Sequence, residues 1–146
     1  MEKLSTAAEK NLKAKKKGWE EAAKRNAMYY ISTKPDLDRN EFFTSGIEQV
    51  ERFTAIFFTS MNFDPTEKRM LDIGCGTGRM TRAFSTIFAE AYGGDISDEM
   101  IKQAKSLNQD ISNVFFDVNN GANLGIYESD FFDFVFSYAQ RLSENV

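Results

Sequence analysis

The sequence predicts an α/β protein with a doubly wound, mostly parallel sheet behind N-terminal helices. Four short runs have the composition of strands, and helical patterns near 80–91 and 97–107 separate the first three. Parallel neighbours need such crossovers, so the β-α-β-α-β-β order predicts this fold class. The four runs are RMLDIG (69–74), YGGDI (92–96), NVFFDV (113–118) and DFFDFVFSY (130–138).

The chain before these strands has a helical composition. Residues 1–31 are rich in Ala, Lys and Glu and predict one or two helices, followed by the polar loop 32–40. The pattern of Ser45 and Glu48 is that of a capping box, which predicts a helix beginning at Ser45 and ending at Asp64-Pro65. The expected division is a helical segment, 1–64, packing on a sheet domain, 65–146.

Length and composition restrict the function. The 146 residues carry a net charge of −4, which argues against nucleic-acid binding, and the lysine-rich run 10–17 is expected to be a solvated helix end. The single Cys75 allows no disulfide and fits a cytoplasmic location. We expect no membrane association, because no apolar run reaches about 18 residues. The absence of histidine argues against a metal site and excludes a histidine base.

The stretch LDIGCGTGRM (71–80) predicts a ligand site. A strand ends there at alternating glycines, and a helix follows, so backbone N–H groups can face a ligand. A dinucleotide site is the first alternative, but its G-x-G-x-x-G pattern has Arg79 at the last position here. Asp95, at the end of the second run, is placed to accept hydrogen bonds from ribose hydroxyls. A ribose-containing ligand is therefore expected.

These residues resemble the class I S-adenosylmethionine-dependent methyltransferases. The similarity lies in LDIGCGTGRMTRAF, GGDISDEMIKQAK and FDFVFSYA, and it covers about residues 19–140. It implies a partial Rossmann-like methyltransferase fold with strand order 3-2-1-4, S-adenosylmethionine as cofactor and a small-molecule methyl acceptor. Residues 65–146 would then be the cofactor-binding half of the domain.

The resemblance also implies roles for individual residues. Asp72 would help to place the methionine ammonium, and Asp95 would hold the ribose, with Ile96 on the adenine face. Asn120 would meet the adenine amino group, and Ser137 would lie near the sulfonium. No catalytic residue is assigned. The cofactor-binding residues implied are Asp72, Gly74, Cys75, Gly76, Gly78, Asp95, Ile96, Asn120 and Ser137.

The length departs from the family pattern, whose sheet has seven strands. The fourth run would be an exposed apolar edge, which is an association site. The chain could be a fragment, a homodimer through that edge, or a natural truncation. Two functions follow: a methyltransferase that uses in-line methyl transfer, and a non-catalytic cofactor-binding or interaction module. A nicotinamide-dependent oxidoreductase is a third, weaker alternative because of Arg79.

Overall fold

The computed structural model describes residues 5–32, 34 and 36–138. Its four strands, numbered along the chain, form one parallel sheet in the order 3-2-1-4, as the resemblance implied. None of the helices in these ranges is long and apolar enough to cross a bilayer. The elements are α1 (Thr6–Ser32), α2 (Arg39–Met61), β1 (Arg69–Ile73), α3 (Arg79–Phe84), β2 (Glu90–Asp95), α4 (Asp98–Leu107), β3 (Val114–Val118) and β4 (Phe134–Ser137).

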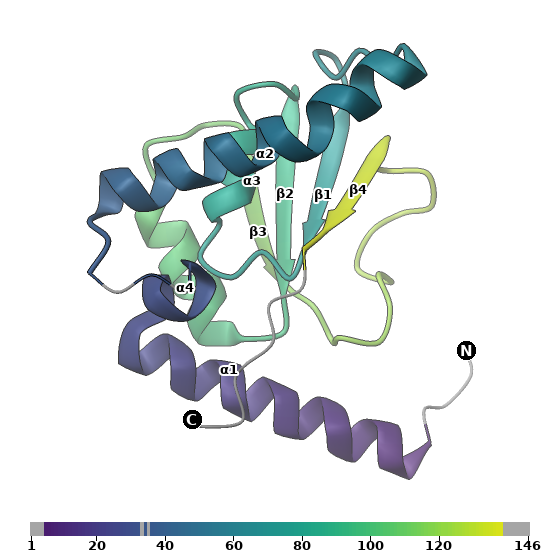
Figure 1. The fold of residues 1–146 in the computed structure, drawn as a ribbon. Coiled ribbons are helices and arrows are strands. Elements are labelled where there is room, and N and C mark those ends of the chain that lie inside the picture. Colours follow the sequence, from purple (N-terminus) through teal and green to yellow (C-terminus); the bar gives the residue numbers. More distant parts are fainter. Residues whose placement is uncertain (1–4, 33, 35, 139–146) are drawn as a thin grey trace.

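Helices α2, α3 and α4 cover one face of the sheet. Met70 of β1 packs there with Val50 of α2 and Phe84 of α3, and Phe116 of β3 packs with Ile101 of α4. Helix α1 runs past the carboxyl ends of the strands (Figure 1). Crossovers in one direction along a sheet lie on one face, which explains why α3 and α4 share theirs.

The opposite face carries aromatic side chains from the long loop between β3 and β4. Tyr92 of β2 stacks on Phe115 of β3 with ring centroids 4.8 Å apart, and Tyr127, Phe131 and Phe132 pack around them. Among the described residues, no helix covers this face. The parallel sheet is therefore confirmed, while a second helical layer is not among these residues.

Phenylalanine dominates the interface between α2 and the sheet. Phe58 lies edge-on to Phe88 and to Phe134 of β4, and Phe84 contacts Phe88 in the same manner. Phe84 is fully buried. Truncation of such a core phenylalanine to alanine costs about 3–5 kcal/mol, so this cluster holds α2 firmly against the sheet.

The predicted start of the second helix at Ser45 is wrong. Helix α2 begins at Arg39, because Asp38 and Glu41 form the capping box there. Ser45 lies inside the helix and its hydroxyl donates to the Phe42 carbonyl at 2.7 Å. The earlier start adds a turn that buries Phe42 and Phe43.

Two further boundaries differ in detail. Helix α3 ends at Phe84, because the Ser85 and Thr86 hydroxyls bond the backbone carbonyls of Arg82 and Ala83, which ends the regular helix. The predicted helix over 80–91 is therefore too long, and Ala91 lies in β2. Helix α1 bends at Asn26, whose side chain accepts a hydrogen bond from the Tyr29 N–H. The sequence predicted one or two helices here, and the bend divides α1 into two helical parts.

Candidate functional site

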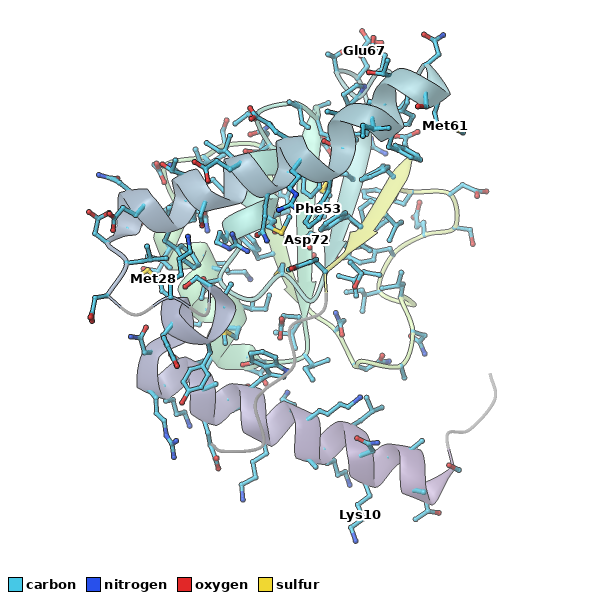
Figure 2. The ribbon with its side chains drawn as sticks, viewed as in Figure 1. Lys10, Met28, Phe53, Met61, Glu67 and Asp72 are labelled. Atoms are coloured by element: carbon cyan, nitrogen blue, oxygen red, sulfur yellow. The ribbon has the colours of Figure 1, made fainter. Side chains whose placement is uncertain are left out.

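A cavity of about 300 Å³ lies where β1, β2 and β4 end. It is bounded by the glycine loop after β1, the start of the segment after β2 and part of α1. Figure 2 shows Asp72 near this end of β1, with Glu67 and Met61 at the opposite end of the sheet. Seven of the nine predicted cofactor-binding residues line the cavity: Asp72, Gly74, Cys75, Gly76, Asp95, Ile96 and Ser137.

The three glycines of the loop share a left-handed backbone but have different surroundings. Their φ angles are 78° at Gly74, 56° at Gly76 and 82° at Gly78. A β-carbon at Gly74 would meet nothing within 4 Å, whereas one at Gly78 would lie 2.5 Å from the Phe116 ring. Gly78 therefore packs closely against Phe116 and does not line the cavity, and its contact with the cofactor stays a prediction. Gly74 leaves open space toward the cavity.

Asp95 fixes the glycine loop to the end of β2. One carboxylate oxygen accepts from the Gly76 N–H at 3.0 Å, and the other accepts from the Ser97 N–H at 2.9 Å. Burial raises the pKa of Asp95, and these backbone hydrogen bonds oppose that shift. Each carboxylate oxygen can accept more than one hydrogen bond, so Asp95 can also accept from ligand hydroxyls.

Asp72 is a buried carboxylate on the floor of the cavity. It is 3% exposed and accepts a hydrogen bond from the Thr81 hydroxyl at 2.7 Å. Burial raises its pKa to about 6, Asp95 adds to that shift, and the hydrogen bond from Thr81 and the charge of Arg79 oppose it. A cation in the cavity would stabilise the ionised form of Asp72.

Arg79 lies between the cavity and α2. It is 5% exposed, and its guanidinium donates to the Ser45 hydroxyl and to the Gln49 side-chain oxygen. Its Nε is buried without a hydrogen-bond partner, and among the described residues Arg79 forms no ion pair. Burial lowers the pKa of Arg79.

Helix α1 contributes residues that the sequence did not predict for the site. Leu12, Lys15 and Trp19 line the cavity from α1. The helix is held there by Glu20, whose carboxylate accepts from the Asp98 N–H at the start of α4. Leu12, Lys15 and Trp19 are spaced by three and four residues, which places them on one helix face. This spacing is the sequence pattern from which their shared position could have been predicted.

Asn120 does not line the cavity, and its predicted contact with the adenine amino group stays a prediction. Its side-chain oxygen accepts from the N–H groups of Ala122 and Asn123 and shapes an exposed turn. Asn119 lines the cavity instead, and its N–H donates to the Asp95 carbonyl at 2.9 Å. Asn119 continues the pairing of β3 with β2, and its neighbour then turns away.

The remaining predicted residues have clear positions. The Ser137 hydroxyl donates to the Ile73 carbonyl at 3.2 Å, which places the end of β4 against the end of β1. Burial raises the pKa of the Cys75 thiol, so it remains protonated at neutral pH and is no nucleophile. Together with Asp72, Gly74 and Asp95, these residues make a small polar site at the carboxyl ends of parallel strands, where α/β sheets bind ligands.

Two solved methyltransferase structures have a fold similar to that of this chain. Magnesium protoporphyrin IX methyltransferase from Synechocystis PCC 6803, with bound S-adenosylmethionine, is 19% identical, with a TM-score of 0.59 over 87% of this chain and 61% of that chain. Phosphoethanolamine N-methyltransferase 1 from Haemonchus contortus, with phosphoethanolamine and S-adenosylhomocysteine, is 17% identical, with a TM-score of 0.57 over 92% and 26%. The present chain thus spans less than two thirds of either protein.

Sequence comparison identifies the family. No curated protein matches the chain. The family model described as "Methyltransferase domain" matches residues 70–145, a range that begins in β1 and includes the glycine loop. The chain belongs to the methyltransferase domain family.

Proposed function

We propose that this chain binds S-adenosylmethionine in the cavity and transfers its methyl group to a small molecule. The observation that carries the proposal is the convergence of Gly74, Asp72 and Asp95 in one cavity at the ends of β1 and β2. The structures of similar fold hold S-adenosylmethionine or S-adenosylhomocysteine, which supports the same ligand here.

The residues fit this cofactor one by one. The open space at Gly74 admits close approach of a ligand to the backbone. Asp72, a buried carboxylate with a raised pKa, suits the cationic ammonium of the methionine part. Asp95 suits the ribose hydroxyls, and Ile96 and Leu12 offer apolar contacts to the adenine.

The chemistry asks the protein mainly for positioning. When bound, the cofactor supplies a methyl group that a sulfonium already activates. The cavity residues hold the reacting groups in line, and such alignment contributes about 7–11 kcal/mol. Because the sequence contains no histidine, an electron-rich acceptor that needs no strong base is favoured.

Isothermal titration calorimetry with S-adenosylmethionine tests the proposal. We expect saturable binding with a Kd in the micromolar range or below, and weaker binding in Asp95→Asn. Asp130→Asn is the matched control, because Asp130 is an exposed carboxylate outside the cavity. A folded chain that does not bind the cofactor, or equal loss in both variants, would contradict the proposal.

The second candidate is a non-catalytic cofactor-binding or interaction module. Its support is β4, an edge strand in which residue Val135 is 52% exposed. We propose that this edge pairs either with a second copy of the chain or with a C-terminal segment of a longer protein. Light scattering with Val135→Lys separates these: a dimer that the variant dissociates supports the second copy, and a monomeric parent contradicts it.

Turnover separates the two functions. Cofactor binding without S-adenosylhomocysteine formation across amine, hydroxyl and carboxylate acceptors would favour the module.

We further propose a cytoplasmic location, which Cys75 as a single reduced thiol fits and which cell fractionation tests. The division into a helical segment, 1–64, and a cofactor-binding half, 65–146, stays a prediction, which limited proteolysis tests.

A further inference from the structure

A second cavity adjoins the proposed cofactor cavity. It has a volume of about 350 Å³ and lies between the end of α1 and the first half of α2. Arg79 and Tyr138 line both cavities, so the two are separated by shared side chains. Because Tyr138 directly follows Ser137 at the end of β4, the second cavity borders the part of the site where the methyl group is expected.

The walls of this second cavity are rich in positive charge. Lys34, Arg52 and Arg79 face it, and Glu48 supplies a carboxylate. Among the residues that the structure describes, the side chains of Lys34 and Arg52 form no ion pair, and neither does Glu48. Three cations against one carboxylate, without internal pairing, create a local positive potential that attracts an anion.

Arg79 adds an argument from burial. A guanidinium that is 5% exposed and forms no ion pair bears a desolvation penalty. The neutral acceptors Ser45 and Gln49 and the charge of nearby Asp72 offset that penalty only in part, since the pKa of Arg79 is still lowered. An anion in the adjoining space would lower that penalty. Arginine also presents several donors in one plane, which suits carboxylate and phosphate groups.

We propose that the methyl acceptor is a small anion and that its carboxylate or phosphate group binds in the second cavity, between Lys34, Arg52 and Arg79. This inference rests on the proposed function, since it assigns the other substrate of the same site. Arg79 can serve the carboxylate of the cofactor as well, but Lys34 and Arg52 do not line the cofactor cavity and remain available to the acceptor.

The test is a titration of the chain, saturated with S-adenosylhomocysteine, with malonate and separately with inorganic phosphate. Amide chemical shifts in NMR spectra report both the affinity and the place of binding. We expect millimolar affinity with the largest shifts in the residues that line the second cavity. The probe that binds more tightly shows whether the group is a carboxylate or a phosphate.

Charge variants assign the binding to this cavity. Exposed ion pairs contribute roughly 0.2–1 kcal/mol, so Arg52→Gln and Lys34→Gln should each weaken anion binding by a factor of about 1.4 to 5. Glu48→Gln should tighten it by a similar factor, because it removes a repulsive carboxylate. The matched controls are Arg25→Gln and Glu51→Gln, which make the same charge changes at exposed positions outside both cavities.

The outcomes separate this inference from the proposed function. If the cofactor binds but neither anion does, or if Arg52→Gln and Arg25→Gln weaken binding equally, the acceptor site is refuted and the cofactor site stands. If S-adenosylhomocysteine does not bind, the proposed function fails, and the same anion titration of the free chain still tests the second cavity. Tighter binding in Glu48→Gln but not in Glu51→Gln would support the inference.

Discussion

Cofactor binding should release protons, because Asp72 changes its ionisation. In the free chain, burial raises the pKa of Asp72 to about 6, so the carboxyl is largely protonated at pH 5 and largely ionised at pH 7. The cofactor ammonium beside it favours the ionised form and lowers that pKa. The cofactor therefore binds more tightly to the chain in which Asp72 is ionised. The affinity of the chain for the cofactor should fall as the pH falls through about 6.

The magnitude follows from the fraction of ionised Asp72. With a pKa of about 6, that fraction is about 0.9 at pH 7 and about 0.1 at pH 5, which gives about tenfold weaker binding at pH 5. This is about 1.4 kcal/mol. Asp95 also has a pKa raised by burial and contributes in the same direction.

The folding stability of the free chain depends on pH in the opposite direction to the cofactor affinity. A carboxyl with a raised pKa in the folded state contributes most stability when protonated, below its unfolded value, and this contribution is lost as the pH rises through about 6. Between the ordinary aspartate pKa of 3.8 and the folded value of about 6, the loss of folding stability amounts to roughly 3 kcal/mol in the free chain. Cofactor binding should therefore raise Tm more at pH 7 than at pH 5.

Calorimetry in two buffers of different ionisation enthalpy measures the proton release directly. At pH 6 we expect about half a proton released per bound cofactor from Asp72 alone, since half of the free chain carries it. Asp72→Asn should lose this release, bind more weakly at pH 7 and vary less with pH. A Kd that is constant from pH 5 to 7 in the parent chain, without proton release, would refute the reasoning.

Three other variants test the glycine loop and the cofactor site. Gly78→Ala should lower the free energy of unfolding by about 1–3 kcal/mol in urea titrations, because a β-carbon would meet Phe116 at 2.5 Å. Gly74→Ala should lower the free energy of unfolding by about 1 kcal/mol, because Gly74 has a left-handed backbone conformation that alanine disfavours. It should nevertheless weaken cofactor binding more than Gly78→Ala does. Asp95→Ala should weaken cofactor binding more than tenfold, about 1.4 kcal/mol, in the calorimetric titration. Equal Kd values for the parent and the Gly74 and Asp95 variants would contradict the site.

Local patterns predicted the strands and one helix cap well. The four strand runs are short, and most are rich in aromatic or aliphatic residues. Ser97 caps α4 by accepting from the Met100 N–H, and a serine before two acidic residues is a typical pattern for such a cap. These features depend on neighbours in the sequence. The parallel order of the strands came from the resemblance to a family.

Contacts between distant residues limited the rest. The sequence contains two capping-box patterns, at Asp38 and at Ser45, and only the burial of Phe42 against the folded core favours the first. The burial of Arg79 depends on Gln49, thirty positions away. Which of Asn119 and Asn120 lines the cavity depends on the turn after β3, where the Asn120 side chain accepts from two backbone N–H groups.

The hydrogen bond from the Gly76 N–H to Asp95 has a consequence for the speed of binding. It holds the loop in its ligand-facing shape in the free chain, so little backbone entropy remains to be lost on binding. A preformed loop makes a separate ordering step unnecessary. Association should therefore follow a single exponential whose rate rises in proportion to ligand concentration, without a plateau set by loop rearrangement.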